Sequence, residues 1–205
     1  MLLFFKTKRD KLLSVLIKAF PREYAADVEA VLNSLTVKSK ADGGQLTSWD
    51  ATEWRLESGE TVSVPYRIFV SDKLSSKYSF TPIQRMIYHC IFSRSYDGFV
   101  RQKHIEALLE DDIPKWAVPY VIKICDEYVK EILEAVYKSL RNKSCESFKA
   151  LCRINFDQFK KGHSRMISYW NEYYRYDCYR FKDYIGKKLY SECFGYNKTG
   201  QKDIQ

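Results

Sequence analysis

Glycine and histidine are scarce in this chain, and their scarcity argues against several classes of enzyme. The 205 residues include eight glycines and three histidines. None of the glycines falls in G-x-x-x-x-G-K-[ST] or G-x-G-x-x-G, the spacings at which backbone amides cradle nucleotide phosphates. The sequence therefore argues against a nucleotide-dependent enzyme, and we expect a non-catalytic protein.

Long apolar runs are absent as well. Two N-terminal apolar stretches, 1–5 and 12–20, are separated by the charged segment 6–11, and no run approaches the ~18 residues that a membrane span requires. No small-residue cleavage site follows them, so we expect no signal peptide. The sequence predicts a cytoplasmic protein with no membrane partner.

Cysteines do not occur at metal-binding spacing. Structural zinc sites usually present C-x(2–4)-C or H-x(3–5)-H pairs, so that one turn grips the metal, and this sequence contains neither pair. In a reducing compartment we expect free, mostly buried thiols and no disulfide, metal or cofactor. The alternative is a zinc site built from His163 and the cysteines near it. The six cysteines are Cys90, Cys125, Cys145, Cys152, Cys178 and Cys193.

The chain has enough apolar material to fold, and it is arranged mainly at helical spacing. Hydrophobic residues make up 45% and aromatic residues 16% of the sequence, which is more than disordered chains contain. Apolar residues recur with a helical period over 12–20, 24–35, 83–91 and 118–140. The stripe over 118–140 is so wide that it predicts one central, buried helix.

Local signals predict a β-hairpin and the start of a helix. Residues 52–56 and 61–70 are rich in Thr, Trp, Val, Tyr and Ile around a Ser-Gly-Glu turn. The sequence Thr-Pro-Ile-Gln at 81–84 predicts a capped helix start, and Gly98 is expected to end that helix by adopting a positive φ. The predicted fold class is mainly α, a multi-helix globular domain with one small β-hairpin insertion near residues 52–70.

Composition divides the chain into four segments of what we expect to be one continuous globular unit. These are an N-terminal helical pair at 1–40, a loop and hairpin at 41–80, a helical core at 81–140, and a basic, aromatic-rich helical segment at 141–205. The last segment holds 14 Lys and Arg but only 7 Asp and Glu. This concentration of positive charge favours an anionic partner. Gly162 and Gly186 are expected to break its helices.

Residues 82–104 fit a helix-turn-helix, with a short helix, a turn containing glycine, and a second helix. The second helix opens with Arg101, Gln102 and Lys103. In such motifs the second helix offers its first side chains to base edges, where Arg reads guanine and Gln reads adenine. These three residues are therefore candidate nucleic-acid contacts. An ordinary helical hairpin is the alternative.

Lysines and arginines alternate with tyrosines in the last segment. Single-stranded nucleic acids are held by such chemistry, with cations on phosphates and aromatic rings under bases. Tyrosines at this density also pack between helices, which is the alternative. The candidate contacts are Lys160, Lys161, Arg165, Tyr173, Arg175, Arg180, Lys182, Lys187 and Lys188, and the further tyrosines are Tyr169, Tyr174, Tyr176 and Tyr179.

Two other groups of residues are candidates for catalysis. His89 stands beside Cys90 within a predicted helix, where neighbouring side chains point about 100° apart. We therefore expect a packed histidine rather than a Cys–His nucleophilic pair. Asp50, Glu53 and Arg55 at the hairpin are faintly similar to a metal-dependent nuclease core, and a solvated hairpin is the alternative.

Three stretches between residues 63 and 138 carry a resemblance to known sequences. They are Val64-Pro65-Tyr66-Arg67-Ile68, Thr81-Pro82-Ile83-Gln84-Arg85 and Asp97-Gly98-Phe99-Val100-Arg101. This part of the chain resembles an uncharacterised bacterial protein family. The resemblance implies a bacterial cytoplasmic setting and no particular activity.

The sequence as a whole favours a non-catalytic intracellular binding protein for an anionic partner, either nucleic acid or an acidic protein surface, with nucleic acid first. The alternative is a protein-interaction module, such as a toxin-neutralising immunity protein or a subunit of a bacterial defence or regulatory complex. A metal-dependent nuclease is the third hypothesis. No feature of the sequence indicates an oligomeric state.

Overall fold

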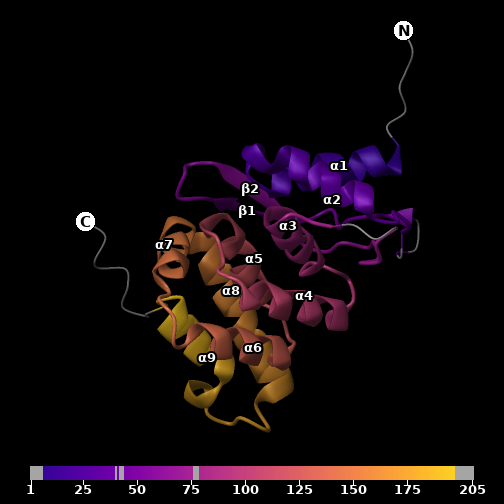
Figure 1. Ribbon diagram of the computed structural model, residues 1–205. Coiled ribbons are helices and arrows are strands. Elements are labelled where there is room, and N and C mark those ends of the chain that lie inside the picture. The colour runs from indigo at the N-terminus through magenta and orange to yellow at the C-terminus, as the bar shows by residue number, and fades with distance from the viewer. Residues whose placement is uncertain (1–6, 40, 42–43, 76–78, 197–205) are drawn as a thin grey trace. The chain divides into compact units, whose positions relative to one another are not determined.

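The computed structural model describes residues 7–39, 41, 44–75 and 79–196. Within them the chain is mainly helical, with one two-stranded antiparallel sheet, which confirms the predicted fold class (Figure 1). The structure divides into two compact units, Met1–Leu108 (unit 1) and Leu109–Gln205 (unit 2). No helix of the described residues is long and apolar enough to cross a membrane. The apolar stretch at 1–5 lies outside the described residues.

Unit 1 begins with two helices, α1 (Lys8–Ala19) and α2 (Ala25–Ser34), as the periodicity predicted. Thr7 and Asp10 close the start of α1 with a capping box, in which the backbone N–H of Asp10 donates to the Thr7 hydroxyl at 3.1 Å. Such a box satisfies amides that have no partner within the helix. The buried faces of the two helices pack against each other and against the hairpin and α3.

The hairpin consists of β1 (Ala51–Arg55) and β2 (Thr61–Pro65), with Trp54 opposite Val62. Both of these side chains are buried, so one face of the hairpin belongs to the core of unit 1. The prediction that the second strand runs to residue 70 is wrong. Pro65 has no N–H to continue the ladder, and among the described residues that follow it the pairing is limited to isolated bridges, including Ile68 with Ser95.

Helix α3 (Pro82–Phe92) starts at the predicted capping box, because the Gln84 N–H donates to the Thr81 hydroxyl at 3.2 Å. Helix α4 (Gly98–Glu110) follows. The expectation that Gly98 ends α3 through a positive φ is wrong, since Gly98 opens α4 and its φ is not positive. Asp97 caps this helix instead, accepting from the Phe99 N–H at 2.9 Å.

The predicted continuous helix over 118–140 is wrong. The structure has two helices there, α5 (Val118–Ile124) and α6 (Lys130–Leu140), separated by a loop. The loop carries Asp126, a buried carboxylate that pairs with the buried Lys123 ammonium at 2.9 Å. Buried charges are tolerated only when they are paired, and apolar periodicity does not register that constraint.

Unit 2 continues through α7 (Glu146–Ile154) and α8 (Phe156–Tyr169), and α8 runs directly into a π-helical turn, η4 (Trp170–Tyr174). The chain then forms a 3₁₀ turn, η5 (Phe181–Asp183), a short helix, α9 (Ile185–Lys188), and a second π-helical turn, η6 (Leu189–Cys193). Helix α9 packs against α6, and α7 against α5.

Gly162 and Gly186 were expected to break helices, and the structure places both inside them. A Cβ on Gly162 would approach the Tyr190 hydroxyl to 3.2 Å, and a Cβ on Gly186 would approach the Tyr184 ring to 2.7 Å. These glycines therefore allow close packing of aromatic side chains, a requirement that only the folded chain reveals.

Candidate nucleic-acid-binding surface

The candidates on α4 are largely engaged within unit 1. Arg101 is only 2% exposed, and its guanidinium donates to the carbonyls of Ser95 and Tyr96 at 3.0 and 3.1 Å. Gln102 donates to Glu106 at 2.9 Å, and Lys103 pairs with Asp72 at 3.0 Å. Arg101 thus holds the turn between α3 and α4, and the site proposed below does not include it.

A histidine pair lies between α3 and α4, and no motif in the sequence indicated that Asp72 would be its partner. The Nδ1 atoms of His89 and His104 are 3.0 Å apart, and His104 Nε2 is 3.3 Å from the Asp72 carboxylate. If His104 donates from Nε2 to the carboxylate, its Nδ1 accepts from His89. The three groups then form a directed chain in which His104 stays neutral.

Burial sets the protonation states of this cluster. Burial lowers the pKa of His104 to about 4, against the opposing hydrogen bond to Asp72. For Asp72, burial raises the pKa, but hydrogen bonds from Lys103 and His104 outweigh it and leave the pKa below its usual value. Burial also raises the pKa of the neighbouring Tyr88 to about 12. These groups hold the segment at Asp72 against the two helices.

Metal-holding clusters and the remaining reactive side chains were the other candidates for chemistry in the part of the chain that the structure describes. Three or more His, Cys, Asp or Glu side chains are nowhere grouped there in a way that could hold a metal ion. Asp50, Glu53 and Arg55, the residues of the nuclease hypothesis, are all exposed at the hairpin. Burial raises the pKa of the Cys90 and Cys125 thiols well above the ordinary value, which disfavours the nucleophilic thiolate.

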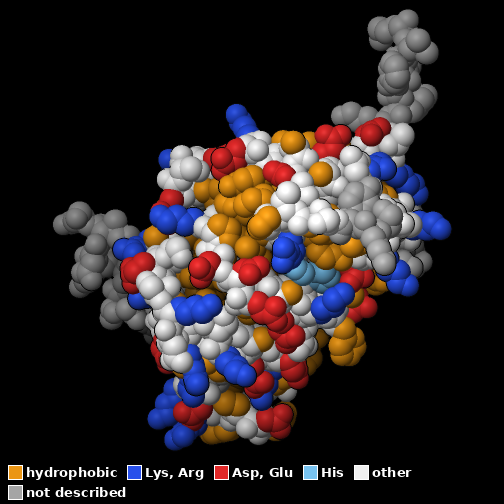
Figure 2. All heavy atoms as spheres, viewed as in Figure 1, with side chains coloured by type: hydrophobic (Ala, Val, Ile, Leu, Met, Phe, Trp, Pro, Cys, Tyr) orange, Lys and Arg blue, Asp and Glu red, His pale blue; other side chains and the backbone are white. Residues whose placement is uncertain are grey.

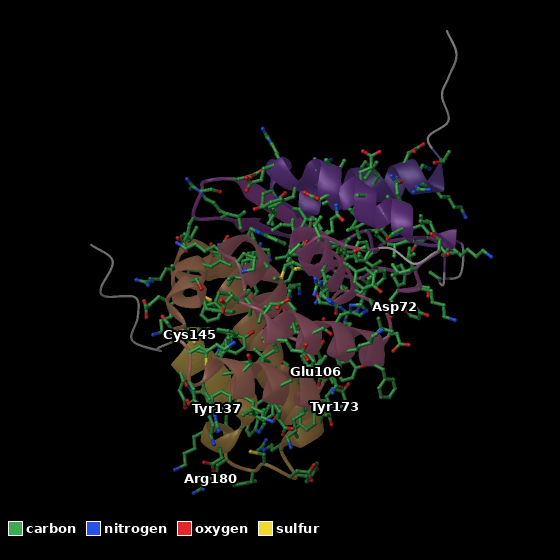
Figure 3. The ribbon with its side chains drawn as sticks, in the orientation of Figure 1. Asp72, Glu106, Tyr137, Cys145, Tyr173 and Arg180 are labelled. Carbon is green, nitrogen blue, oxygen red and sulfur yellow. The ribbon has the colours of Figure 1, made fainter. Side chains whose placement is uncertain are left out.

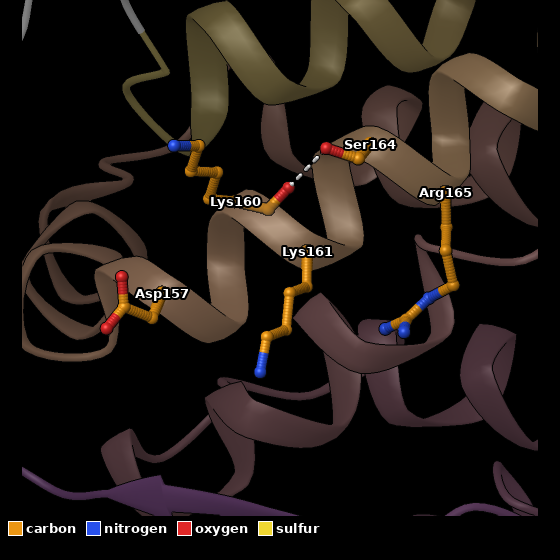
Figure 4. A pocket seen from close by; sticks show the side chains of 5 residues that line it. All are labelled: Asp157, Lys160, Lys161, Ser164 and Arg165. Atoms are coloured by element: carbon orange, nitrogen blue, oxygen red, sulfur yellow. Dashed lines mark hydrogen bonds between the residues drawn. The ribbon is translucent and has the colours of Figure 1, made fainter.

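The basic candidates on α8 surround a hollow of about 540 Å³ (Figure 4). Figure 4 shows Lys161 and Arg165 pointing to one side of α8 and Lys160 pointing to another, while the Ser164 hydroxyl donates to the Lys160 carbonyl at 3.0 Å. Lys160 and Lys161 are exposed. The hollow is lined by Asp157, Lys160, Lys161, Ser164 and Arg165.

Arg165 has a structural as well as a surface role. Its guanidinium pairs with the buried carboxylate of Asp126, which also accepts from the Lys123 ammonium. The Arg165 side chain nevertheless remains partly exposed at the edge of the hollow. This contact docks the loop between α5 and α6 on α8. The sequence missed Asp126, although two consecutive acids within an apolar stripe are a signal that could have marked the break.

A group of exposed tyrosines lies beyond the hollow, on η4 and in the segment that follows it. We call Tyr173, Tyr176 and Tyr179 the tyrosine surface; their exposed fractions are 56%, 97% and 75%. The Tyr173 ring contacts the rings of Tyr128 and Tyr169, with centroid distances of 5.9 and 6.1 Å. Rings so exposed are available to a partner, whereas most aromatic side chains in folded proteins are largely buried.

The remaining basic candidates differ in their exposure and in whether they already contact another side chain. Arg175 lies 6.0 Å from the ring centroids of both Trp170 and Tyr179, and Arg180 pairs with Asp183 at 2.6 Å. Lys182 is exposed. The last two candidates are half-buried residues of α9, Lys187 and Lys188.

Unit 2 therefore presents a small basic hollow and a tyrosine surface rather than one uniformly basic face. Figure 3 labels Tyr173 and Arg180 among the side chains of this unit. In the lower part of Figure 2, which Figure 1 assigns to the C-terminal elements, Lys and Arg side chains lie beside Asp and Glu side chains. Local charge, not only net charge, therefore decides where an anion is attracted.

Comparison of the chain with protein-family models, with curated proteins and with solved structures finds no match. The resemblance of residues 63–138 to a bacterial family thus stays a prediction. The function has to be argued from the side chains themselves.

Proposed function

We propose that the chain is a non-catalytic cytoplasmic protein that binds nucleic acid through unit 2. The observation that carries this proposal is the hollow on α8, which is lined by three cationic side chains, Lys160, Lys161 and Arg165, and by one acid, Asp157. Lysines that line a hollow attract phosphate groups, and each phosphate neutralised releases counterions into solution.

The charge of the surrounding sequence supports a polyanion rather than a small anion. Residues 141–205 carry twice as many basic as acidic residues, so that a long anionic ligand gains from charges beyond the hollow. A single phosphate would use only the few cations around α8. The distribution supports a ligand that extends along the unit.

A non-catalytic role is supported by the state of the reactive groups described above. The histidines at 89 and 104 are engaged with each other and with Asp72, and burial raises the pKa of the thiols of Cys90, Cys125, Cys152 and Cys193. A nucleophile or general base has to reach its substrate in the correct protonation state. The hollow on α8 offers lysine and arginine, which suit binding.

Charge reversal at the hollow tests the proposal. We expect Lys160→Glu with Lys161→Glu to weaken binding of a labelled DNA or RNA by about tenfold or more at ~50 mM salt, since phosphate contacts are strongest at low salt. Fluorescence anisotropy measures the affinity, and circular dichroism checks that the exposed substitutions leave the fold intact.

A matched control removes the same charge elsewhere. Lys138 and Lys143 are exposed residues of unit 2 that do not line the hollow, and their reversal to Glu changes the net charge equally. We expect that variant to bind much more tightly than the variant of the hollow. Equal losses in the two variants, or no binding of any nucleic acid at micromolar protein, would refute the proposal.

A protein partner is the second candidate, and two side chains of unit 1 favour it. Trp49 and Phe99 are 89% and 86% exposed. Large exposed rings are common at the centres of protein interfaces. Replacing both with Ala and comparing the proteins captured from the native host with those captured by the unaltered chain tests this candidate. Capture of the same partners by both chains would count against it.

A further inference from the structure

We infer that the nucleic acid bound by unit 2 is single-stranded, and that its bases stack on the tyrosine surface while its phosphates lie at the hollow on α8. This inference rests on the proposed function. It specifies that the ligand is single-stranded, and it assigns base stacking to the exposed tyrosine rings, which phosphate binding alone does not require.

The exposure of the rings is the first step. Tyr176 and Tyr179 expose most of their surface to water, and Tyr173 exposes more than half of its own. A flat partner that covers these rings removes apolar area from water, which is favourable. Nucleic-acid bases have two flat faces, but in a duplex both faces are already covered by neighbouring base pairs. Only unpaired bases are free to stack on protein rings.

Contacts within unit 2 restrain Tyr173 and Tyr179 before any ligand arrives. The Tyr174 hydroxyl donates to the Tyr128 carbonyl and accepts from the Lys130 N–H at 3.3 Å, which ties η4 to the loop between α5 and α6. Tyr173, which directly precedes Tyr174 in the chain, packs on Tyr128. The Arg175 guanidinium lies 6.0 Å from the ring centroids of Trp170 and Tyr179. Side chains held in place lose less entropy when a ligand binds.

Electrostatics alone cannot hold a strand at the tyrosine surface. Residues 170–183 contain three basic and three acidic residues, so that their formal charges cancel. Arg180, one of the basic three, already pairs with Asp183. Affinity at these residues must therefore come from stacking, and a ligand that offers only phosphates would gain little from them.

The hollow and Tyr173 lie on one continuous helical segment, and Tyr176 and Tyr179 come directly after it. Lys161 and Arg165 on α8, Tyr169 at its end and Tyr173 on η4 are each four residues apart, a spacing that places side chains near one another on a helix surface. From Lys161 to Tyr173 the helix rises by about 18 Å at 1.5 Å per residue. A strand of several nucleotides reaches both parts, whereas a duplex would gain only from the cations.

Binding assays with four ligands test the inference on the full chain. We would measure fluorescence anisotropy with a single-stranded DNA of about 20 nucleotides, longer than common single-strand site sizes, and with an RNA of the same length. A duplex of that length and an abasic single strand, which keeps the phosphates and lacks the bases, are the comparisons. We expect at least one single strand to bind about tenfold or more tightly than both comparisons.

The rings are tested by paired substitutions. Replacing Tyr173, Tyr176 and Tyr179 with Ala should reduce single-strand affinity to that of the abasic strand, while Phe at the same positions should preserve it, since the ring is kept and only the hydroxyl is lost. Because Tyr173 packs on neighbouring rings, the Ala variant of Tyr176 and Tyr179 alone repeats the test with two side chains that carry little of the fold.

The outcomes separate this inference from the proposed function. If duplex or abasic strands bind as tightly as both single strands, or if the Ala variants bind as the Phe variants do, the stacking inference is wrong and phosphate binding by unit 2 survives. If no nucleic acid binds, the proposed function fails and the inference fails with it. A preference for either single strand supports the inference, and it shows whether the ligand is RNA or DNA.

Discussion

The cations around the α3–α4 turn of unit 1 and the lysines of α8 in unit 2 are used in opposite ways. In unit 1 the arginines around the α3–α4 turn point inward: Arg94 is fully buried and donates to the carbonyls of Pro65 and Tyr66, and Arg101 donates to those of Ser95 and Tyr96. In unit 2, Lys160 and Lys161 are exposed around a hollow. A basic residue near a helix start therefore indicates a binding site only where the folded chain has not already engaged it.

Unit 2 also contains buried charges, and we expect the largest loss of stability when their pairing is broken. Asp126 is buried between Lys123 and Arg165. Asp126→Asn should destabilise unit 2 by about 3–5 kcal/mol, because it leaves the buried Lys123 charge without its counterion. Urea unfolding measures the change. Exposed ion pairs contribute about 1 kcal/mol or less. A loss below about 1 kcal/mol would therefore mean that the Asp126 contacts behave as a surface ion pair.

The corresponding change in unit 1 should be nearly as large. Arg101→Ala removes two hydrogen bonds from a buried guanidinium, and each such charged bond contributes about 1.5–3 kcal/mol. We expect the free energy of unfolding of unit 1 to fall by roughly 2–4 kcal/mol after partial relaxation. Sequence-specific DNA binding lost without any loss of stability would contradict the structural role and restore the helix-turn-helix hypothesis.

Acid pH should affect unit 1 through its histidine pair. Burial lowers the pKa of His104 from 6.5 to about 4 in the folded chain. The unfolded chain therefore takes up the proton first, and stability present above pH 6.5 is lost as the pH falls toward 4, by up to about 3 kcal/mol. Unfolding curves between these pH values measure the loss. His104→Asn should flatten the dependence, and a variant that keeps the full slope would assign the effect to other groups.

The smallest effect is expected at the exposed lysines of unit 2. Lys160→Ala with Lys161→Ala should change stability by no more than about 0.5 kcal/mol, as is usual for surface substitutions. Thermal unfolding measures it, with Arg101→Ala as the contrasting variant. A loss as large as that of Arg101→Ala would show that the two units do not differ in how they use their cations.

Local chemistry made much of the fold predictable. The Thr81 capping box, the turn of the hairpin and the first two helices depend on residues within a few positions of one another, and each was predicted from the sequence. The break after α5 was missed because it depends on Asp126 meeting Arg165, which lies 39 residues away in the chain. Apolar periodicity does not identify such a contact, although the consecutive acids Asp126 and Glu127 interrupt the stripe where the helix breaks.

In the candidate site, too, residue types could be read from the sequence but tertiary contacts could not. The cations and tyrosines of α8 and η4 were candidate contacts from the sequence because the two residue types alternate there, and they remain a prediction. The sequence did not distinguish Arg101, which is buried, from Lys160, which is exposed. It also did not predict that Tyr174 would be anchored to the loop at Tyr128 while Tyr176 remained in water. Exposure is decided by tertiary packing, which composition does not encode.

Photo-crosslinking tests the contrast between the two units most directly. A single strand of about 20 nucleotides that carries photoreactive bases spans the expected site; it would be bound to the full chain, irradiated and digested, and the attached peptides would be identified by mass spectrometry. The account predicts attachment to peptides that contain Tyr173, Tyr176 or Tyr179, and loss of that signal in the Ala variants. Attachment confined to Arg101, Gln102 and Lys103 on α4 would contradict a binding site in unit 2.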